Sequence, residues 1–282
     1  MNLENTVKKA SQKLKDNNII SYLLDAEIIL ADILGVERES LITNNKVNVS
    51  QKIVLKYNKA IERRIKSEPI AYILGKKEFW SENFIVDRST LVPRPETELL
   101  IHKLINIYKN KRINILDIGT GTGCILLSLL KELYNSRGIG IDISSQAVRI
   151  AKINSKNLKL TNRAKFKNFD LDGYKMVKFD LIVSNPPYIP SQEIRKLSKD
   201  ITNFEPRKAL DGGPDGLDLI KKIIYKSNIL LKKNGILAIE IGFGQYRAVS
   251  EILNSYKFRE FSKVYDNNNN VRCIITTKTG FY

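Results

Sequence analysis

The sequence predicts an α/β protein, in which a doubly wound, mostly parallel seven-stranded sheet follows an N-terminal helical bundle. From Arg112 onward, short apolar segments alternate with amphipathic helical segments, which is the pattern of a parallel sheet covered on both faces. Before residue 70, apolar residues recur instead at three- and four-residue spacing. The length of 282 residues suits one large domain with a smaller accessory domain.

The first 70 residues predict a small helical domain. Helical periodicity covers three segments, residues 5–17, 21–34 and 50–66. Gly35 is a suitable helix stop, and Ser50 is a suitable N-cap for the third helix. Because none of these segments carries a catalytic set of side chains, we expect residues 1–70 to recognise the substrate.

A linker of residues 71–90 is predicted to contain a short β-hairpin, since aromatic and apolar residues flank the polar residues 81–83. Pro93 and Pro95 then favour an extended segment that enters a helix. The second, larger domain is therefore expected to span residues 91–282.

Within this domain the alternation of strands and helices is regular. We expect seven strands, at residues 113–118, 138–143, 164–169, 179–184, 236–241, 258–265 and 271–276. We expect helices between them at residues 124–133, 145–157, 217–231 and 246–255. The last two strands form a hairpin, which would add an antiparallel edge to the sheet.

A glycine-rich loop is predicted where the first strand of the sheet meets the first helix. Asp117 lies in that strand, and the loop that follows consists of Gly119, Thr120, Gly121, Thr122 and Gly123. Glycines let the backbone turn sharply and approach a ligand closely, and ligands of open α/β sheets bind beyond the carboxyl ends of the strands. Asp142 ends the next strand, where its carboxylate can accept both hydroxyls of a ribose.

Two cofactors fit this arrangement. A dinucleotide site uses the pattern G-x-G-x-x-G, with a pyrophosphate at the helix N-terminus. This loop instead has the pattern G-x-G-x-G after Asp117, whose carboxylate would repel a pyrophosphate but suits a cationic methionine ammonium. The loop thus resembles motif I of the class I S-adenosylmethionine methyltransferases. We therefore expect S-adenosyl-L-methionine as the cofactor, with Asp170, at the end of the third strand, reaching its adenine region.

A second motif, Asn185-Pro186-Pro187-Tyr188, follows the fourth strand. The consecutive prolines stiffen the loop and remove two N–H donors. Asn185 offers a side-chain carbonyl and Tyr188 a flat ring, a set that suits a planar group bearing an NH₂. An amide nitrogen is a poor nucleophile. Two acceptors, the Asn185 side chain and the Pro186 carbonyl, can grip its N–H bonds and aim it at a methyl carbon.

Motifs of this type occur in methyltransferases that act on adenine amines and on glutamine amides. The remaining sequence separates the two. Residues 91–98 (Leu-Val-Pro-Arg-Pro-Glu-Thr-Glu), the loop at 184–190, and residues 204–216 (Phe-Glu-Pro-Arg-Lys-Ala-Leu-Asp-Gly-Gly-Pro-Asp-Gly) together closely resemble the release-factor glutamine methyltransferase family. The resemblance covers nearly the whole chain.

The resemblance implies that residues 91–282 are an S-adenosylmethionine-dependent methyltransferase domain. Its substrate would be the glutamine of the GGQ motif in class-1 peptide chain release factors, methylated on the side-chain N5. The glycine-rich loop and Asp142 would hold the cofactor, with Asn185 contacting it as well. The substrate glutamine would be held by Asn185, Pro186, Pro187 and Tyr188, and catalysis would depend on Asn185, Pro186 and Tyr188.

One position departs from the family pattern. In some members an aromatic residue follows the acid at the end of the third strand and packs on adenine, whereas Leu171 stands there in this chain. Leu171 is therefore expected to make an aliphatic contact with the cofactor instead.

Two other functions remain open at this point. A DNA or RNA adenine N6-methyltransferase would share the Asn-Pro-Pro-Tyr chemistry and would suit the net charge of +17. The chain lacks, however, a target-recognition domain large enough to read a duplex, which base flipping would need. A basic binding protein without activity is disfavoured, because both motifs are intact.

The composition bears on the cellular location of the protein and on its thiols. No stretch approaches 18 consecutive apolar residues, and the N-terminus lacks the apolar core of a signal peptide. We therefore expect a cytoplasmic protein without membrane association. Cys124 and Cys273 are expected to be reduced structural thiols, His102 to be non-catalytic, and the chain to hold no metal. The chain is rich in Lys, Asn and Ile together, the residues that an A/T-rich coding sequence favours. We therefore expect much of the charge to reflect coding drift on solvated faces, so direct nucleic-acid binding is not required.

Overall fold

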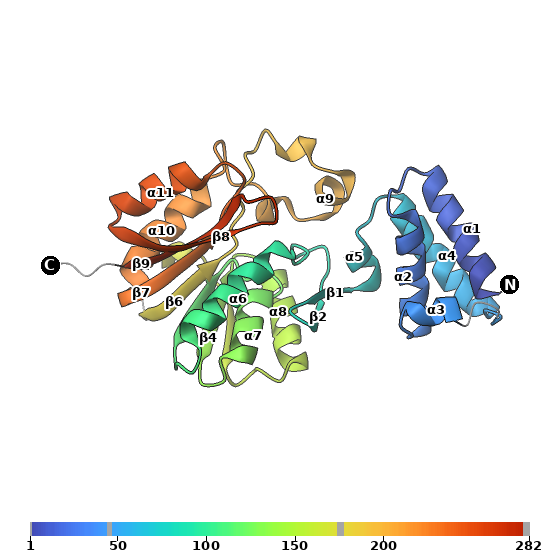
Figure 1. Cartoon of the computed structure of the whole chain (residues 1–282), viewed down its shortest axis with the longest axis horizontal. Helices are drawn as coiled ribbons and strands as arrows, with labels where there is room; N and C mark the ends of the chain where they lie inside the picture. The colour runs from blue at the N-terminus through green and yellow to red at the C-terminus, as the bar shows by residue number, and fades with distance from the viewer. Residues whose placement is uncertain (1, 44–46, 174–177, 279–282) are drawn as a thin grey trace. The chain divides into compact units, whose positions relative to one another are not determined.

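The computed structural model describes residues 2–43, 47–173 and 178–278, and the chain divides into two compact units. The first, helical unit comprises Met1–Lys76 together with Ser198–Phe204. The second, sheet-containing unit comprises Lys77–Leu197 and Glu205–Tyr282 (Figure 1). The linker hairpin expected between two domains therefore groups almost entirely with the sheet.

Within residues 2–43 and 47–76, the helical unit contains the three predicted helices and two shorter ones. Its N-terminal elements are α1 (Leu3–Asp16), α2 (Tyr22–Leu34), α3 (Glu39–Thr43), α4 (Gln51–Ile65) and α5 (Ile70–Leu74). Gly35 ends α2 in a left-handed conformation, and the Ser50 side chain caps α4 by accepting the Ile53 N–H, as predicted. The two five-residue helices were not predicted, because they are too short to show a periodic pattern.

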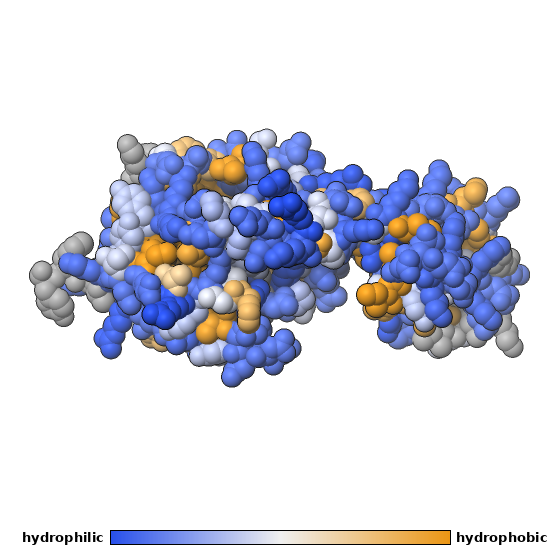
Figure 2. Space-filling model, turned by 90° about the horizontal axis from the view of Figure 1, so that it is seen from above, coloured by the Kyte–Doolittle hydropathy of each residue, from blue (hydrophilic) through white to orange (hydrophobic). Residues whose placement is uncertain are grey.

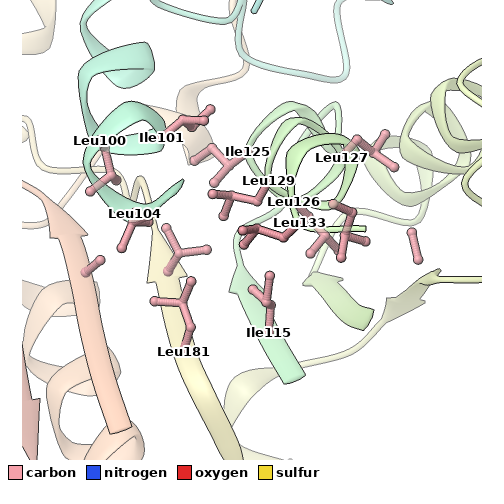
Figure 3. Close-up of a cluster of buried hydrophobic side chains, with 14 of the residues drawn as sticks. Leu100, Ile101, Leu104, Ile115, Ile125, Leu126, Leu127, Leu129, Leu133 and Leu181 are labelled. Atoms are coloured by element: carbon pink, nitrogen blue, oxygen red, sulfur yellow. The ribbon is translucent and has the colours of Figure 1, made fainter. Parts of the chain in front are cut away.

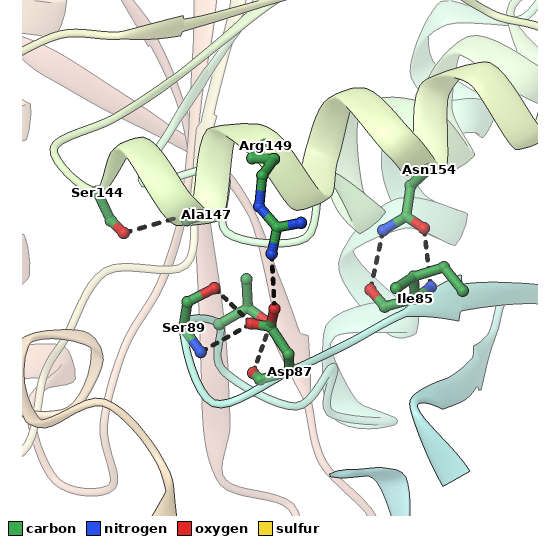
Figure 4. Close-up of polar contacts among 8 residues, drawn as sticks. Ile85, Asp87, Ser89, Ser144, Ala147, Arg149 and Asn154 are labelled. Carbon is green, nitrogen blue, oxygen red and sulfur yellow. Dashed lines mark hydrogen bonds and ion pairs between the residues drawn. The ribbon is translucent and has the colours of Figure 1, made fainter.

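The hairpin consists of β1 (Lys76–Phe79) and β2 (Glu82–Ile85), and one buried asparagine holds it against the sheet unit. Asn154, on α8 (Ser145–Asn157), accepts the Ile85 N–H at 2.8 Å and donates to the Ile85 carbonyl at 3.0 Å (Figure 4). Its amide also donates to the Thr122 carbonyl at 2.9 Å. The side chain thus pairs with β2 as a neighbouring strand would, and it ties the hairpin to the glycine-rich loop.

The main sheet has seven strands in the order β5-β4-β3-β6-β7-β9-β8, of which β9 and β8 run antiparallel to their neighbours. The strands are β3 (Asn114–Ile118), β4 (Arg137–Asp142), β5 (Ala164–Asn168), β6 (Phe179–Ser184), β7 (Leu231–Glu240), β8 (Phe258–Tyr265) and β9 (Val271–Lys278). This is the doubly wound, mostly parallel sheet that the sequence predicted. The strand order changes direction at β3, which lies between β4 and β6.

Helices cover both faces of the sheet (Figure 1). Residues of α6 (Glu96–Tyr108), α7 (Cys124–Glu132) and α8 pack on one face, and those of α10 (Asp218–Leu230) and α11 (Tyr246–Ser255) pack on the other. Neighbouring residues of one strand alternate between them: Ile115 belongs to the first cluster and Leu116 to the second. Figure 3 shows Ile115 beneath the leucines of α7 and Leu181 below Leu104 of α6.

The strand β7 begins earlier than predicted, at Leu231 instead of Ile236. Leu231 pairs with Phe179, and the register then shifts so that Ile236 pairs with Leu181. The intervening polar residues 232–235 form this irregularity and hide the strand signal. Short elements between β5 and α10 were also missed, namely η1 (Leu171–Gly173), η2 (Ile194–Lys196), α9 (Lys199–Phe204) and η3 (Arg207–Ala209).

Replacing Asn154 by alanine should lower the free energy of unfolding by about 3 kcal/mol, because it leaves part-buried backbone groups of Ile85 and the buried carbonyl of Thr122 without partners. Denaturation followed by the fluorescence of Trp80, the one tryptophan of the chain, reports on this unit. The adjacent Ser155 is a matched control: its hydroxyl is buried without a hydrogen-bond partner among the described residues, so Ser155→Ala should cost less than about 1 kcal/mol. Equal losses for the two variants would refute this role of Asn154.

Candidate active site

The carboxyl ends of four parallel strands meet at one edge of the sheet. Ile118 of β3 is paired with Ile141 of β4 and with Ser184 of β6, and Ser184 is paired with Ile239 of β7. The Ser184 hydroxyl also donates to the Ile118 carbonyl at 2.7 Å. The glycine-rich loop, Asp142, the Asn-Pro-Pro-Tyr loop and Glu240 are therefore neighbours in the fold although they lie far apart in sequence.

The glycine-rich loop is anchored on β4 and leaves open space at its turn. The N–H groups of Gly119 and Thr120 both donate to the Ile141 carbonyl, at 2.9 and 3.0 Å. Gly119 has φ +69°, a conformation that L residues with a side chain rarely adopt. An added Cβ there would meet no atom within 4 Å. Glycine is thus required by the backbone conformation, and space for a ligand lies in front of it.

Asp142 faces the same loop, and backbone N–H groups hold both of its carboxylate oxygens. Oδ2 accepts the Gly121 N–H at 3.0 Å, and Oδ1 accepts the Ser144 N–H at 2.9 Å. Burial raises the pKa of this carboxyl, while the backbone N–H groups oppose that shift. Each oxygen keeps a further lone pair, so the carboxylate can still accept hydroxyl groups of a ligand.

Asp117 is fully buried at the end of β3. The Thr120 hydroxyl donates to its Oδ2 at 2.6 Å, whereas Oδ1 is buried without a hydrogen-bond partner among the described residues. Burial raises the pKa of Asp117 to about 7. A buried carboxylate oxygen of this kind is costly unless a cation or an N–H donor meets it.

The Asn-Pro-Pro-Tyr loop follows β6 directly, and its first residue is held by α6. Asn185 is half-buried, and its Nδ2 donates to the Thr97 hydroxyl at 3.2 Å. The Thr97 hydroxyl in turn donates to Glu240 Oε2 at 2.7 Å. Because the amide nitrogen of Asn185 is engaged in this way, its Oδ1 is the atom left to accept hydrogen bonds from a ligand.

Tyr188 is fixed by two charged residues. Its hydroxyl donates to Glu240 Oε1 at 3.3 Å and accepts from the Arg272 guanidinium at 3.2 Å. The Arg272 guanidinium carbon also lies 5.7 Å from the centroid of the Tyr188 ring, within cation–π range. Burial, and then the charge of Glu240, raise the pKa of Tyr188, so the phenol stays protonated.

The segment after η3 packs directly on this loop. Gly212 donates to the Ile189 carbonyl at 2.9 Å, and a Cβ at Gly212 would lie 2.8 Å from the Pro187 carbonyl oxygen. The Gln245 amide donates to the carbonyls of Tyr188 at 2.9 Å and Gly216 at 3.3 Å. The sequence around 204–216 thus supports the Asn-Pro-Pro-Tyr backbone.

Sequence reasoning missed four supporting residues, namely Thr97, Glu240, Gln245 and Arg272. Two of them carried a usable signal. Glu240 is a charged residue that follows the apolar residues 236–239 of β7, and it is 1% exposed. Thr97 lies between two glutamates at the start of α6 and is 2% exposed. Nothing in the sequence connects Gln245 or Arg272 with Tyr188.

The two residues expected near adenine follow β5, and Leu171 begins η1. The Asp170 carboxylate is exposed, and its Oδ1 accepts from Lys222 Nζ at 2.8 Å and from the Asp172 N–H at 3.0 Å. Leu171 is 4% exposed and packs in the core with α10. Little of Leu171 is therefore open to a ligand, and contact of either residue with a cofactor stays a prediction.

Neither His102 nor Cys124 was expected to take part in the chemistry, and Cys124 directly follows Gly123 of the glycine-rich loop. His102 is exposed on α6, and burial raises the pKa of the Cys124 thiol to about 12. Within residues 2–43, 47–173 and 178–278, no group of three His, Cys, Asp or Glu side chains could hold a metal ion. Over the same ranges, every helix is too short or too polar to span a bilayer.

The glycine-rich loop after β3 and the Asn-Pro-Pro-Tyr loop after β6, on a doubly wound sheet, define a methyltransferase, and the methyltransferase domain family matches residues 109–278. The PrmC N-terminal domain family matches residues 5–75. A solved methyltransferase structure from Pyrococcus furiosus shares the fold, with a TM-score of 0.55 at 15% identity over 80% of this chain and 96% of that chain.

Curated relatives identify the family more closely. The release factor glutamine methyltransferase of Caulobacter vibrioides is 36% identical over 95% of this chain and 94% of its own length. The protein of the same name from Buchnera aphidicola subsp. Schizaphis graminum is 42% identical over 92% of each chain. This chain belongs to the release factor glutamine methyltransferase family.

The raised pKa of Asp117 predicts a pH-dependent stability for the ligand-free protein. An unfolded aspartate titrates near pH 4, so between about pH 4 and about pH 7 the folded state binds more protons than the unfolded state. The free energy of unfolding therefore falls as the pH rises through this window. Asp117→Asn, which is neutral throughout, should flatten the decline of the melting temperature between about pH 5 and about pH 8. Identical slopes for the two proteins would show that Asp117 is already ionised in the folded state at pH 5.

Proposed function

We propose that this chain transfers a methyl group from S-adenosyl-L-methionine to the side-chain N5 of the glutamine in the GGQ motif of class-1 peptide chain release factors. The observation that carries the proposal is the orientation of Asn185, whose amide nitrogen is bound by Thr97 so that its carbonyl oxygen is free to accept. The names of the curated relatives support the same substrate. They do not favour the adenine alternative.

The residues at the sheet edge fit S-adenosyl-L-methionine, which when bound supplies an electrophilic methyl group on a sulfonium. The open turn at Gly119 admits a ligand next to the backbone. Asp142 keeps lone pairs for ribose hydroxyls, and the unpartnered Oδ1 of Asp117 suits a cationic ammonium. Asp170 and Leu171 are proposed for the adenine end, with Asp170 shared with Lys222.

In this proposal the protein acts on the amide mainly by positioning it. The glutamine NH₂ donates one hydrogen bond to Asn185 Oδ1 and one to the Pro186 carbonyl, and Tyr188 packs beside its planar group. Pro186 and Pro187 supply no competing N–H donors. Fixing the nitrogen in line with the methyl carbon supplies several kcal/mol of barrier lowering without a strong base.

Methyl transfer from labelled cofactor tests the proposal directly. Purified release factor, duplex DNA and tRNA are offered in parallel reactions. Label should enter the release factor alone, and a release factor with Gln→Ala in the GGQ motif should receive none. Label on nucleic acid with none on protein would reject the proposal in favour of an adenine methyltransferase. Methylation of release factors would take place in the cytoplasm, which is therefore the proposed location of this protein.

Two substitutions should separate cofactor binding from methyl transfer. Asp142→Ala should weaken cofactor binding by about 1–3 kcal/mol, through loss of charge-assisted hydrogen bonds. Asn185→Ala should leave cofactor affinity nearly unchanged but lower turnover on the order of a hundredfold, which corresponds to roughly 3 kcal/mol. Calorimetry and single-turnover kinetics measure the two effects. Near-normal turnover of Asn185→Ala with cofactor bound would contradict the positioning mechanism.

The helical unit is proposed to recognise the release factor. Ile20 is 96% exposed in the turn before α2, and Leu23 and Leu24 on α2 are 49% and 43% exposed. Figure 2 shows apolar patches on the otherwise hydrophilic surface of this unit. Exposed apolar groups of this kind are common at protein contacts.

Ile20→Ser combined with Leu23→Ser should raise the KM for whole release factor about tenfold while leaving cofactor affinity unchanged. Tyr134→Ser is the control, because Tyr134 is 75% exposed but precedes β4 and so lies at the opposite, amino edge of the parallel strands. If the double variant and the control had the same KM, recognition would have to lie elsewhere.

A further inference from the structure

A continuous chain of hydrogen bonds runs beneath the Asn-Pro-Pro-Tyr loop, between groups from four separate elements. Asn185 Nδ2 contacts the Thr97 hydroxyl at 3.2 Å, and that hydroxyl contacts Glu240 Oε2 at 2.7 Å. On the other side, Glu240 Oε1 lies 3.3 Å from the Tyr188 hydroxyl, which lies 3.2 Å from Arg272. Thr97 and Glu240 are 2% and 1% exposed, so water does not compete for these bonds.

The direction of every hydrogen bond in this chain follows from its members. When Glu240 is ionised, its carboxylate only accepts, so both hydroxyls that meet Glu240 must give their protons to it. Thr97 then has no proton left for Asn185 and can only accept. The group of Asn185 that faces Thr97 must therefore be the NH₂, and its carbonyl oxygen must point away from Thr97. At the other end, the Arg272 guanidinium can only donate, which is consistent with Tyr188 donating to Glu240.

Glu240 is held in place for this role by its surroundings. Its two oxygens each accept one hydroxyl, and the positive charge of Arg272 offsets the cost of burying the carboxylate. Hydrogen bonds connect Arg272 to Glu240 through the Tyr188 hydroxyl, so the same carboxylate also fixes the Tyr188 ring. Thr97 has a small side chain with a single hydroxyl, and valine would match its shape without the hydrogen bonds.

We propose that Thr97 and Glu240 are positioning residues that lock the side-chain amide of Asn185 with its carbonyl toward the substrate, and that this lock makes the site select an amide over a carboxylate. The inference rests on the proposed function for the identity of the amide. With Oδ1 presented, a glutamine NH₂ is bound and a glutamate carboxylate is repelled. An Asn185 free to flip would present its NH₂ to the ligand and would accept a carboxylate.

The test compares the wild-type protein with Thr97→Val, Thr97→Ser and Glu240→Gln, all as full chains. Each is titrated calorimetrically with release factor carrying its natural glutamine and with release factor carrying Gln→Glu at that position. The ratio of the two Kd values measures the discrimination between amide and carboxylate. Turnover on the natural substrate and cofactor affinity are measured alongside.

Thr97→Val should lower the discrimination ratio at least fivefold and turnover roughly tenfold or more, with cofactor affinity within about twofold of wild type. Thr97→Ser keeps the hydroxyl, so its discrimination ratio and its turnover should remain close to those of the wild-type protein. Glu240→Gln is nearly isosteric and provides a second route, because its amide can donate to Thr97 and so release the proton of Thr97 for the Asn185 carbonyl. It should lower the ratio as well.

A readout independent of any substrate is the nuclear magnetic resonance signal of the Asn185 side-chain NH₂, assigned by its loss in Asn185→Ala. Thr97→Val should shift this signal and Thr97→Ser should not. Unchanged discrimination and an unchanged signal in folded Thr97→Val and Glu240→Gln would overturn the proposed lock. Failure of the wild-type protein to bind or methylate release factor would instead overturn the proposed function, while the resonance comparison would still decide the role of Thr97.

Discussion

The site depends on the parallel register of the central strands. Pairing of Ile118 with both Ile141 and Ser184 brings the ends of β3, β4 and β6 to one edge, and pairing of Ser184 with Ile239 adds the end of β7. Ile118 and Glu240, which are 122 positions apart in sequence, thereby come to the same edge of the sheet. A slip of one residue in any of these pairs would turn the polar groups at the strand ends to the other face of the sheet.

Burial of charge is the second organising constraint. Asp117, Asp142 and Glu240 all lie at this edge, and burial raises the pKa of each carboxyl. Two of them are compensated within the chain, Asp142 by backbone N–H groups and Glu240 by two hydroxyls and the nearby Arg272. Asp117 keeps one oxygen without a partner among the described residues. Asp117 is therefore suited to meet a cationic ligand, whereas Glu240 is suited to orient other side chains.

Much of the fold could be predicted from the sequence, because its elements carry strong local patterns. The bounds of α8, α11, β6 and β8 agree with those expected from periodicity alone. The early start of β7 was not predictable, since the polar residues around Asn234 interrupt an apolar strand and only pairing of Leu231 with Phe179 defines its beginning. Local patterns also miss helices of five or six residues such as α3 and α9.

For the site, the residues proposed to meet ligands and the residues that support them differ in how far they could be predicted. Gly119 and Asn185 lie in motifs whose chemistry can be predicted from the types and order of their residues. Thr97 and Arg272 matter because the tertiary structure brings them to Asn185 and Tyr188. These contacts cannot be predicted from local patterns in a single sequence. The placement of Leu171 in the core is likewise a tertiary result.

Tandem mass spectrometry of release factor after incubation with the protein and S-adenosyl-L-methionine tests the central claim most directly. The fragment that contains the GGQ motif should gain the mass of one methyl group, and fragmentation should place that methyl on the side-chain nitrogen of the glutamine. An unmodified glutamine fragment in the presence of active, cofactor-bound protein, or a methyl group on any other residue, would contradict the account.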